Sequence, residues 1–416
     1  MTTDARATIR DFLARSRTAQ TVFLAELVKV PSDNPPGDCA PHAARAQALL
    51  EAHGLEVERH VPAPDLIGDA GMVSAVNLVV RTRFGDGPTI ACNAHGDVVP
   101  PGLGWSTDPY GAEIRDGRMY GRGAAVSKSD FATYTFALLA LKAVQAAGGA
   151  ALAGTVELHF TYDEETGGEV GPQWLLANSI SRPDLVISAG FSYGIVTAHN
   201  GCLHLEVEVI GQSGHAAQPE KGVDALEAAH AILGELYAYR KTLAALRSSV
   251  PGIGSPTLVV GLIRGGINTN VVPDNVTFRL DRRIVPEEAA AEAERELRHL
   301  IGAAAAKWPG ITCRVRRVLL AEPFVHRAGQ ERLVQAIARN ARDVLGVEVS
   351  AHGVPLYTDA RHYGAAGIPT VLYGAGPRTL EEANGHRADE NLRLDDLYRA
   401  TEIVALTLFD LLRPTR

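Results

Sequence analysis

The sequence predicts an α/β protein in which a β-α-β-β-α-β segment interrupts a larger domain. In the first half, apolar strands alternate with helical patterns and acidic residues follow the strand ends, which is typical of a mainly parallel sheet with flanking helices. Near Gly201 the pattern changes to the period-two alternation of a half-exposed strand, and near Glu331 the first pattern resumes. We therefore expect a first domain part at 1–200, an inserted domain at 201–316 and a second domain part at 317–416.

Length and composition agree with a two-domain globular protein. The 416 residues exceed what one hydrophobic core usually organises. A formal net charge of -8 argues against a nucleic-acid partner and against an anionic membrane surface. The apolar runs are too short to span a bilayer, and the N-terminus lacks the apolar core of a signal peptide. The four cysteines lie far apart and predict neither a disulfide framework nor a cysteine-rich zinc site, so we expect a cytoplasmic protein.

Apolar residues at helical or alternating spacing, together with proline and glycine breaks, delimit the elements of the first part. The expected helices are 5–30, 40–53, 131–145 and 172–178. The expected strands are 76–81, 89–94, 155–162 and 184–189. A proline-rich stretch separates the first two helices, and a Gly-Arg-Gly turn precedes the third.

The inserted segment has the element order of an open-faced sandwich. Its expected strands are 202–210, 257–263, 276–284 and 313–320. Its expected helices are 223–246 and 286–308, and the second of these begins at a proline. Beyond the segment we expect a helix at 331–345, a strand at 370–373 and a C-terminal helix at 394–412.

Two polar motifs follow strand ends, where α/β sheets place their functional groups. His95-Gly-Asp97 follows the strand at 89–94, and a carboxylate two residues from a histidine can fix the ring for metal binding. Asp163-Glu164-Glu165 follows the strand at 155–162, and three adjacent carboxylates repel one another unless a cation or proton relieves them. One of them can bind a metal while its neighbour acts as a general base. A polar strand end and a solvated acidic turn are the simpler interpretations.

Four further motifs carry polar groups that could take part in a site. His386 lies in a turn before the final helix, and His215 lies in a Gly-His-Ala stretch of the inserted segment. Asn270 and Arg283 offer an amide and a guanidinium, which suit a substrate carboxylate. Taken singly, a lone histidine is usually structural and such loops are usually surface loops.

The order of these motifs resembles, over nearly the whole chain, the zinc-dependent family of aminoacylases, acetylornithine deacetylase, succinyl-diaminopimelate desuccinylase and glutamate carboxypeptidases. The matching pieces are Pro31-Ser-Asp-Asn-Pro-Pro-Gly37, His95-Gly-Asp97-Val-Val-Pro, Trp105 with Asp108-Pro-Tyr110, Tyr120-Gly-Arg-Gly-Ala, Asp163-Glu164-Glu165-Thr-Gly, Gly214-His215-Ala, Asn270-Val-Val-Pro, Asp281-Arg-Arg283, Asp359-Ala-Arg, Gly367-Ile-Pro-Thr and His386.

The resemblance implies a phosphorylase/hydrolase-like catalytic domain that is split around a ferredoxin-like lid, and the lid also forms a homodimer. It implies two zinc ions that share a water molecule and a bridging carboxylate. His95 would bind one ion, with Asp97 behind it. Glu165 and His386 would bind the other ion.

The resemblance also implies roles for four residues that handle the substrate. Glu164 would take a proton from the water and deliver it to the leaving amine. His215 of the partner subunit would reach the oxyanion. Asn270 and Arg283 would hold the free carboxylate of the substrate.

Two expected metal ligands are replaced in this sequence. The family's bridging aspartate, three residues after the second glycine of the Gly-Arg-Gly turn, is Val126 here, and the stretch 188–193, where another carboxylate ligand is expected, contains no acid. His95, Glu165 and His386 remain. Catalytic zinc usually has three protein ligands and a water, so we expect one or two zinc ions, with reduced occupancy because of Val126.

Nearby residues offer replacements for the lost ligands. A local register shift would let Ser127 or Asp130 contribute, but both also fit as caps of the helix expected at 131–145. Ser127 and Lys128 form a second possibility, a serine activated by a lysine, although adjacent residues rarely face each other on a helix. The spare histidines that could serve as ligands are His199, His352 and His362.

The sequence thus predicts a hydrolase that cleaves an amide bond of a small carboxylate-bearing substrate, such as an N-acyl amino acid or a dipeptide, by metal-activated water with Glu164 as general acid and base. The alternative is a metal-poor protein on the same fold. That protein would either use Glu164 for proton transfer without hydrolysis or bind a small molecule without catalysis.

Overall fold

The structure, a computed structural model, describes residues 4–414 and contains the predicted α/β architecture. The chain forms two compact units. The first contains the described residues up to Thr197, together with His326–His352 and those from Thr358 onward. The second contains Ala198–Val325 and Gly353–Tyr357. The second unit therefore extends past the expected limit of 316, because the strand that crosses that position completes its sheet.

The first unit is built on a mixed sheet, which has eight strands within residues 4–414 in the order β1-β2-β6-β3-β7-β14-β8-β13. These strands are β1 (Glu58–His60), β2 (Asn77–Arg83), β3 (Thr89–His95), β6 (Thr155–Thr161), β7 (Leu185–Ser188), β8 (Ile195–His199), β13 (Ala351–Val354) and β14 (Thr370–Leu372). The four central strands β6, β3, β7 and β14 are parallel. Antiparallel pairs flank them, between β1 and β2, β2 and β6, and β14 and β8.

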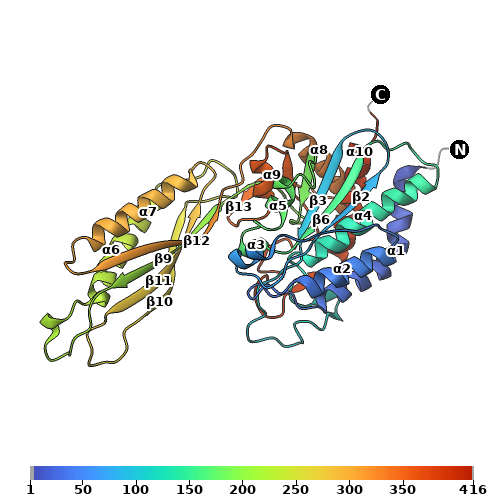
Figure 1. Cartoon of the computed structure of the whole chain (residues 1–416). Coiled ribbons are helices and arrows are strands. Elements are labelled where there is room, and N and C mark those ends of the chain that lie inside the picture. Colours follow the sequence, from blue (N-terminus) through green and yellow to red (C-terminus); the bar gives the residue numbers. More distant parts are fainter. Residues whose placement is uncertain (1–3, 415–416) are drawn as a thin grey trace. The chain divides into compact units, whose positions relative to one another are not determined.

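Helices cover both faces of this sheet (Figure 1). They are α1 (Ala5–Val28), α2 (Ala40–Ala52), α3 (Pro64–Asp69), α4 (Lys128–Ala146), α5 (Pro172–Ala177), α8 (Gln330–Leu345), α9 (Ala360–Ala365) and α10 (Leu394–Leu411). Alternation along β3 explains the two faces, because Ile90 and Cys92 join the main core while Ala91 packs with Val186 and Tyr363. A small separate sheet joins β4 (Glu113–Arg115), β5 (Arg118–Tyr120) and β15 (Asn391–Arg393).

The long helix α4 is the centre of the first unit's core. It packs against α1 and α10 as well as against β3 and β6. Phe131 of α4 stacks on Phe160 of β6, with ring centroids 3.9 Å apart. Because nearly every side chain of α4 is buried, its N-terminal turn, which follows the Gly-Arg-Gly motif, is held rigidly beside the strand ends.

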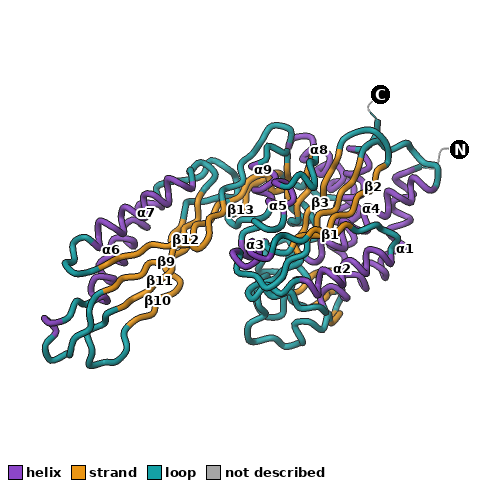
Figure 2. The backbone as a smooth tube through the Cα atoms, in the orientation of Figure 1, coloured by secondary structure: helices purple, strands orange, loops and turns teal. Residues whose placement is uncertain are grey.

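The second unit confirms the predicted β-α-β-β-α-β order (Figures 1 and 2). Its elements are β9 (Gly201–Ile210), α6 (Ala225–Leu243), β10 (Thr257–Gly265), β11 (Asn275–Ile284), α7 (Ala290–Ala305) and β12 (Thr312–Ala321). The sheet order is β10-β11-β9-β12, and every pairing is antiparallel. Leu203, Leu205 and Val207 alternate along β9 and pack into a core with α6 and α7. The other face of the sheet carries the intervening, more polar side chains.

None of the helices in the described part of the chain combines the length and apolar composition that crossing a lipid bilayer requires. None of the four cysteines, all of which lie in the described part of the chain, forms a disulfide; three are buried and one is half-buried.

Candidate active site

The carboxyl ends of two neighbouring strands bring the predicted metal ligands together. Strands β3 and β6 are parallel, and their register pairs His95 with Thr161. The segments that follow them therefore leave the sheet side by side. As a result, ligand atoms of His95, Glu164 and Glu165 lie within 4.8 Å of one another. In the sequence this cluster is divided between two strands that are about seventy residues apart.

Asp97 organises this cluster from behind. It is fully buried, and its Oδ1 lies 3.3 Å from Nδ1 of His95. The same carboxylate accepts hydrogen bonds from the backbone amides of Glu164, at 3.3 Å, and Glu165, at 3.1 Å. The backbone carbonyl of Asp97 lies 3.0 Å from the same Nδ1, so both oxygens of this residue hold that nitrogen and leave Nε2 of His95 available to a ligand. Asp97 thus fixes both the imidazole ring and the acidic loop.

The proline-rich stretch supports Asp97. Asn34 donates a hydrogen bond from Nδ2 to Oδ2 of Asp97 at 3.0 Å. The Ser32 hydroxyl donates to the Gly96 carbonyl at 2.6 Å, and the Tyr110 hydroxyl donates to Asp33. The stretch 31–37 therefore acts as a brace for the His95-Gly-Asp97 segment, a role that its sequence did not reveal.

The cluster contains more negative charge than the described side chains around it neutralise. Burial raises the pKa of Glu164 well above its usual value, and Glu165 and Asp359 add to this rise against the effect of His95. Burial also raises the pKa of Glu165 to about 8. Although burial alone would lower the pKa of His95, Glu164 and Asp97 raise it well above its usual value. Crowded buried carboxylates of this kind favour a bound cation.

His386 lies beside this cluster. Its Nε2 is 3.6 Å from Oε1 of Glu165, and its side chain is 53% exposed. Burial lowers the pKa of His386, and Arg122 and His95 add to the effect. The neutral imidazole that results is the form that binds metals.

The Gly-Arg-Gly turn is held by a buried ion pair. Arg122 Nη1 lies 2.6 Å from Oε2 of Glu390, and both side chains are almost completely buried. The other carboxylate oxygen of Glu390 accepts from the backbone amides of Ala125, at 3.1 Å, and Val126, at 3.2 Å. The Val126 side chain is half-buried and packs against the main core. Its position is therefore fixed, and it offers no donor atom to a metal.

Ser127 and Lys128 form neither the helix cap nor the serine–lysine pair that the sequence offered. Ser127 precedes α4, but its side chain makes no cap; its hydroxyl accepts from the backbone amide of His95 at 3.3 Å. The capping prediction for Ser127 is therefore wrong, because the neighbouring strand end takes its hydroxyl. Lys128 Nζ donates to the Val30 carbonyl at 3.0 Å, and burial lowers the pKa of Lys128 to about 7. Within residues 4–414 no hydrogen bond joins Ser127 to Lys128.

Asp130 connects two loops and is not part of the His95–Glu164–Glu165 cluster. Its carboxylate accepts from the backbone amides of Ala375, at 2.6 Å, and Gly190, at 3.2 Å. Burial raises the pKa of Asp130 to about 7. A side chain on Gly190 would meet Tyr373, whose backbone nitrogen would lie 2.7 Å from the new Cβ. The acid-free stretch 188–193 is thus packed too tightly at Gly190 to regain a carboxylate without movement of β14.

The spare histidines lie outside the donor clusters of the described residues. His362 Nε2 contacts the Gly167 carbonyl at 2.9 Å. His199 and His352 contact backbone carbonyls through Nδ1, at 2.9 and 3.3 Å. The buried acid that sequence reasoning missed is Asp359, whose pKa burial raises to about 6. The Asp359-Ala-Arg motif was its only signal.

The predicted substrate residues lie in the second unit. His215 forms a bridge with Val271, and the Ala216 amide donates to the Asn270 carbonyl at 3.0 Å, so the two exposed loops that carry His215 and Asn270 adjoin. Arg283 lies on β11, where its Nε and Nη2 each contact Asp281 at 3.0 Å. Its guanidinium is therefore already paired with a carboxylate.

Comparison with known proteins identifies the class of this protein as a hydrolase of carbon–nitrogen bonds, and it also identifies the family. Residues 91–410 match Peptidase family M20/M25/M40, and the chain belongs to this family. It is 31% identical over 347 residues to the acetylornithine deacetylase of Proteus mirabilis (strain HI4320), covering 82% of each chain. These matches confirm the resemblance inferred from the motifs and the predicted enzyme class.

Two solved structures share the fold. Human carnosine dipeptidase 1 superposes with a TM-score of 0.76 at 17% identity and covers 100% of both chains. The Bacillus subtilis YXEP protein, which is described as a dinuclear metal binding peptidase, superposes with a TM-score of 0.64 at 17% identity and covers 96% of this chain and 100% of its own.

Proposed function

We propose that this protein is a metal-dependent amidohydrolase that cleaves the amide bond of a small carboxylate-bearing substrate, such as an N-acyl amino acid or a dipeptide. The observation that carries the proposal is the convergence of His95, which is buried, with the half-buried Glu164 and Glu165 within 4.8 Å in an acid-rich site. The names of the relatives, an acetylornithine deacetylase and a carnosine dipeptidase, support this class of substrate.

The residues present fit one divalent cation. His95, Glu165 and His386 would hold it, a set of two imidazoles and one carboxylate that suits zinc. His386 lies 3.6 Å from Glu165 but outside the group whose ligand atoms are within 4.8 Å of one another, so its side chain would have to move closer to complete the set. The raised pKa of Glu165 supports this fit, because a cation would relieve the crowding of negative charge. Since Val126 provides no donor, the set supports one ion rather than the pair described for the Bacillus subtilis protein. When bound, the ion would polarise the substrate carbonyl and make a water molecule more acidic.

Glu164 would move the proton during the reaction. A water molecule adds to the carbonyl carbon, and Glu164 takes its proton as general base. The carbon–nitrogen bond then breaks, and Glu164 gives the same proton to the leaving nitrogen as general acid. A carboxyl group whose pKa is raised by burial is suited to both steps near neutral pH. Asp97 would act by orienting His95 and the loop that carries Glu164.

The second unit would contribute the substrate contacts and the dimer interface. Asn270 and Arg283 would hold the substrate carboxylate, and His215 of the partner subunit would stabilise the oxyanion. The adjoining loops of His215 and Asn270 support a joint role. Val259, Leu262 and Ile263 are exposed on β10, an edge strand, and support a homodimer that this unit mediates.

One observation favours the alternative of a metal-poor protein. By the resemblance, Val126 and the stretch 188–193 lack two of the family's metal carboxylates; Val126 packs against the core, and Gly190 has no room for a side chain. Such a protein would use Glu164 for proton transfer without hydrolysis, or would only bind a small molecule. The two proposals differ in their need for metal.

The test combines metal content with a matched pair of variants. Protein purified without chelator is assayed for zinc and for hydrolysis of N-acyl amino acids and dipeptides, before and after chelation. Glu164→Gln should keep its zinc but lose turnover by about 10²–10⁴-fold, which is typical of a lost general acid–base group. The control is Glu169→Gln, an exposed acid in the same loop, and it should match the wild type. Absence of zinc together with hydrolysis that chelators do not affect would overturn the metal-dependent mechanism, whereas full turnover in Glu164→Gln would overturn the role of Glu164.

A further inference from the structure

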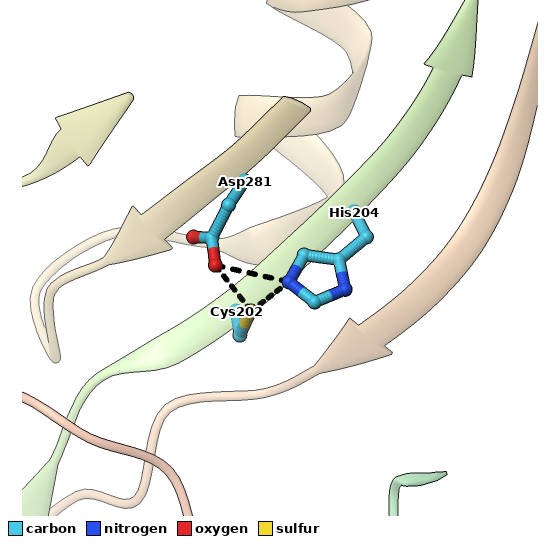
Figure 3. Close-up of side chains that lie close together, drawn as sticks. All are labelled: Cys202, His204 and Asp281. Carbon is cyan, nitrogen blue, oxygen red and sulfur yellow. Dashed lines mark hydrogen bonds and ion pairs between the residues drawn. The ribbon is translucent and has the colours of Figure 1, made fainter. Parts of the chain in front are cut away.

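Three side chains of the second unit converge on the sheet face that lies opposite its helices. Sγ of Cys202 lies 3.2 Å from Nε2 of His204, and the same nitrogen lies 3.0 Å from Oδ2 of Asp281. The sulfur and that carboxylate oxygen are 3.9 Å apart. The three atoms therefore form a closed triangle (Figure 3).

The register of the sheet creates this cluster. Cys202 and His204 are two residues apart on β9, so they point to the same face. Strand β11 pairs antiparallel with β9, and its register sets Asp281 directly opposite His204. Directly opposed side chains on one face have Cβ atoms about 5 Å apart, which brings the polar ends into contact.

A nucleophilic triad does not explain the geometry. In such a triad the acid holds one ring nitrogen and the nucleophile contacts the other. Here Cys202 and Asp281 both contact Nε2 of His204, so no proton relay runs through the ring. In this cluster the three donor atoms instead lie at the corners of one triangle, as the ligand atoms around a metal ion do.

We propose that Cys202, His204 and Asp281 form a second cation site, which takes a thiophilic divalent metal ion such as Zn²⁺. Zinc bonds of about 2.3 Å to sulfur, 2.0 Å to nitrogen and 2.0 Å to oxygen give ligand–ligand separations of about 3.3–3.6 Å in a tetrahedron. The observed separations of 3.2, 3.0 and 3.9 Å bracket these values. Small side-chain rotations would close the site.

The donor set selects the class of ion. Sulfur and imidazole nitrogen are ligands of zinc, cobalt and related ions, whereas Mg²⁺ and Ca²⁺ prefer oxygen ligands. The thiolate of Cys202 and the carboxylate of Asp281 together balance a double positive charge. The side chains of His204 and Asp281 are 34% and 31% exposed, so an ion can enter and a water molecule can take the fourth position.

Arg283 orients Asp281 in this site, and ion binding would weaken one of the contacts that Arg283 makes. Its Nε donates to Oδ1 of Asp281 at 3.0 Å, which leaves Oδ2 directed toward His204. Such an outer contact orients a metal-binding carboxylate. Arg283 Nη2 also contacts Oδ2 at 3.0 Å, and a bound ion would compete with that contact. Occupancy would therefore loosen part of the ion pair that holds Arg283.

The proposal does not depend on the amidohydrolase function, because the two clusters share no residue. It is tested with Co²⁺, which absorbs in the near ultraviolet when a thiolate binds it. The first-unit cluster has no cysteine, so a thiolate-to-cobalt band distinguishes the second-unit cluster from it. Titration of the full-length wild type with Co²⁺ should produce this band, and Zn²⁺ should remove it by competition.

Variants assign the band to the cluster. Cys202→Ser should abolish the band, and Cys313→Ser, which changes a half-buried thiol on β12 of the same unit, should keep it. Cys202 is fully buried, so its substitution could disturb folding. His204 is partly exposed, and a variant at this position should disturb folding less. His204→Ala should weaken Co²⁺ binding by more than about tenfold, at least the effect of losing an outer-shell partner. No band in the wild type, or a band that persists in Cys202→Ser, would overturn the proposal.

Discussion

The two donor clusters of this protein use similar side chains in opposite electrostatic settings. The first-unit cluster lies in loops after parallel strands, and burial raises the pKa of Glu164 and Glu165. The second-unit cluster lies on the strands themselves, and there His204 and Arg283 lower the pKa of Asp281 although burial opposes them. The first cluster therefore carries unbalanced negative charge, and the second is nearly balanced without a metal.

This difference separates two ways of building a metal site. In the first unit, packing forces carboxylates together, and the fold bears a cost that only a cation or protons relieve. In the second unit, the positive charge of Arg283 partly neutralises Asp281, as a bound cation would. The second-unit cluster is therefore stable without a metal ion. Changes around the first cluster should therefore have large effects on stability and metal affinity, and equivalent changes in the second unit should have small ones.

The largest expected effect on stability comes from the buried pair Arg122–Glu390. Glu390→Gln leaves the guanidinium of Arg122 buried without a counter-charge, which should lower the free energy of unfolding by about 3–5 kcal/mol. The comparison is Glu235→Gln in the second unit, whose exposed pair with Lys307 should matter by only about 0–1 kcal/mol. Urea unfolding of both variants measures the difference, and equal losses would contradict the contrast between the units.

The next effect concerns metal affinity at the first cluster. Asp97→Asn removes the charge beside His95 and keeps an oxygen acceptor for one of the two loop amides, and it should weaken zinc binding by about 10–100-fold. The matched control is Asp86→Asn, an exposed acid in a surface loop. Competition with a fluorescent chelator gives both affinities. Unchanged affinity in Asp97→Asn would mean that the Asp97 carboxylate does not control metal binding at this cluster.

Lys128 predicts the pH dependence of stability. Burial lowers its pKa to about 7 in the folded state, whereas the unfolded chain has the ordinary lysine value. At a pH above the ordinary lysine pKa, Lys128 is neutral in both the folded and the unfolded state. Between that pKa and about 7, only the unfolded state binds a proton on Lys128. The free energy of unfolding therefore falls by about 1.4 kcal/mol for each pH unit as the pH is lowered through this range. Wild-type protein should therefore gain stability as the pH rises from about 7.5 to about 9.5, and Lys128→Met should flatten this rise. Urea unfolding at several pH values gives the free energy of unfolding of both proteins. If this free energy changed with pH in the same way in both, Lys128 would be charged in the folded state.

The smallest expected change tests the lost bridging ligand. Val126→Asp places a carboxylate where the family resemblance implies one, and it should add one equivalent of bound zinc. Val126→Ala removes the two methyl groups of the valine without adding a donor and should leave the zinc content unchanged. Elemental analysis of both variants measures this, and equal zinc in the two would show that a carboxylate at this position is not sufficient for a second ion.

The sequence predicted those parts of the fold and site that local pattern determines. Alternation and helical spacing predicted β3, β6 and the β-α-β-β-α-β unit, and the strand ends marked His95 and Glu165. The contacts that sequence reasoning missed depend on distant parts of the chain. Arg122 meets Glu390 across 268 positions, and Asp130 meets the amide of Ala375 across 245. No periodicity carries such information.

The prediction for Ser127 shows why local rules fail at this site. Serine before a helix is a typical N-cap, yet its hydroxyl accepts from the His95 amide of a neighbouring strand. Tertiary contact outweighed the local preference. The Cys202–His204–Asp281 cluster was missed for a related reason, since it depends on the pairing register of β9 with β11, which the alternation of each strand leaves open.

The central claim is that the first-unit cluster holds a catalytic ion although Val126 occupies the position where the family resemblance implies a metal ligand. The most direct measurement is zinc per subunit in Cys202→Ser protein, which removes the second-unit site from the count, combined with the turnover of an N-acyl amino acid by the same sample. We predict one zinc ion per subunit and hydrolysis that falls with its removal and returns with its replacement. Protein without zinc that hydrolyses the substrate at the same rate would contradict the claim.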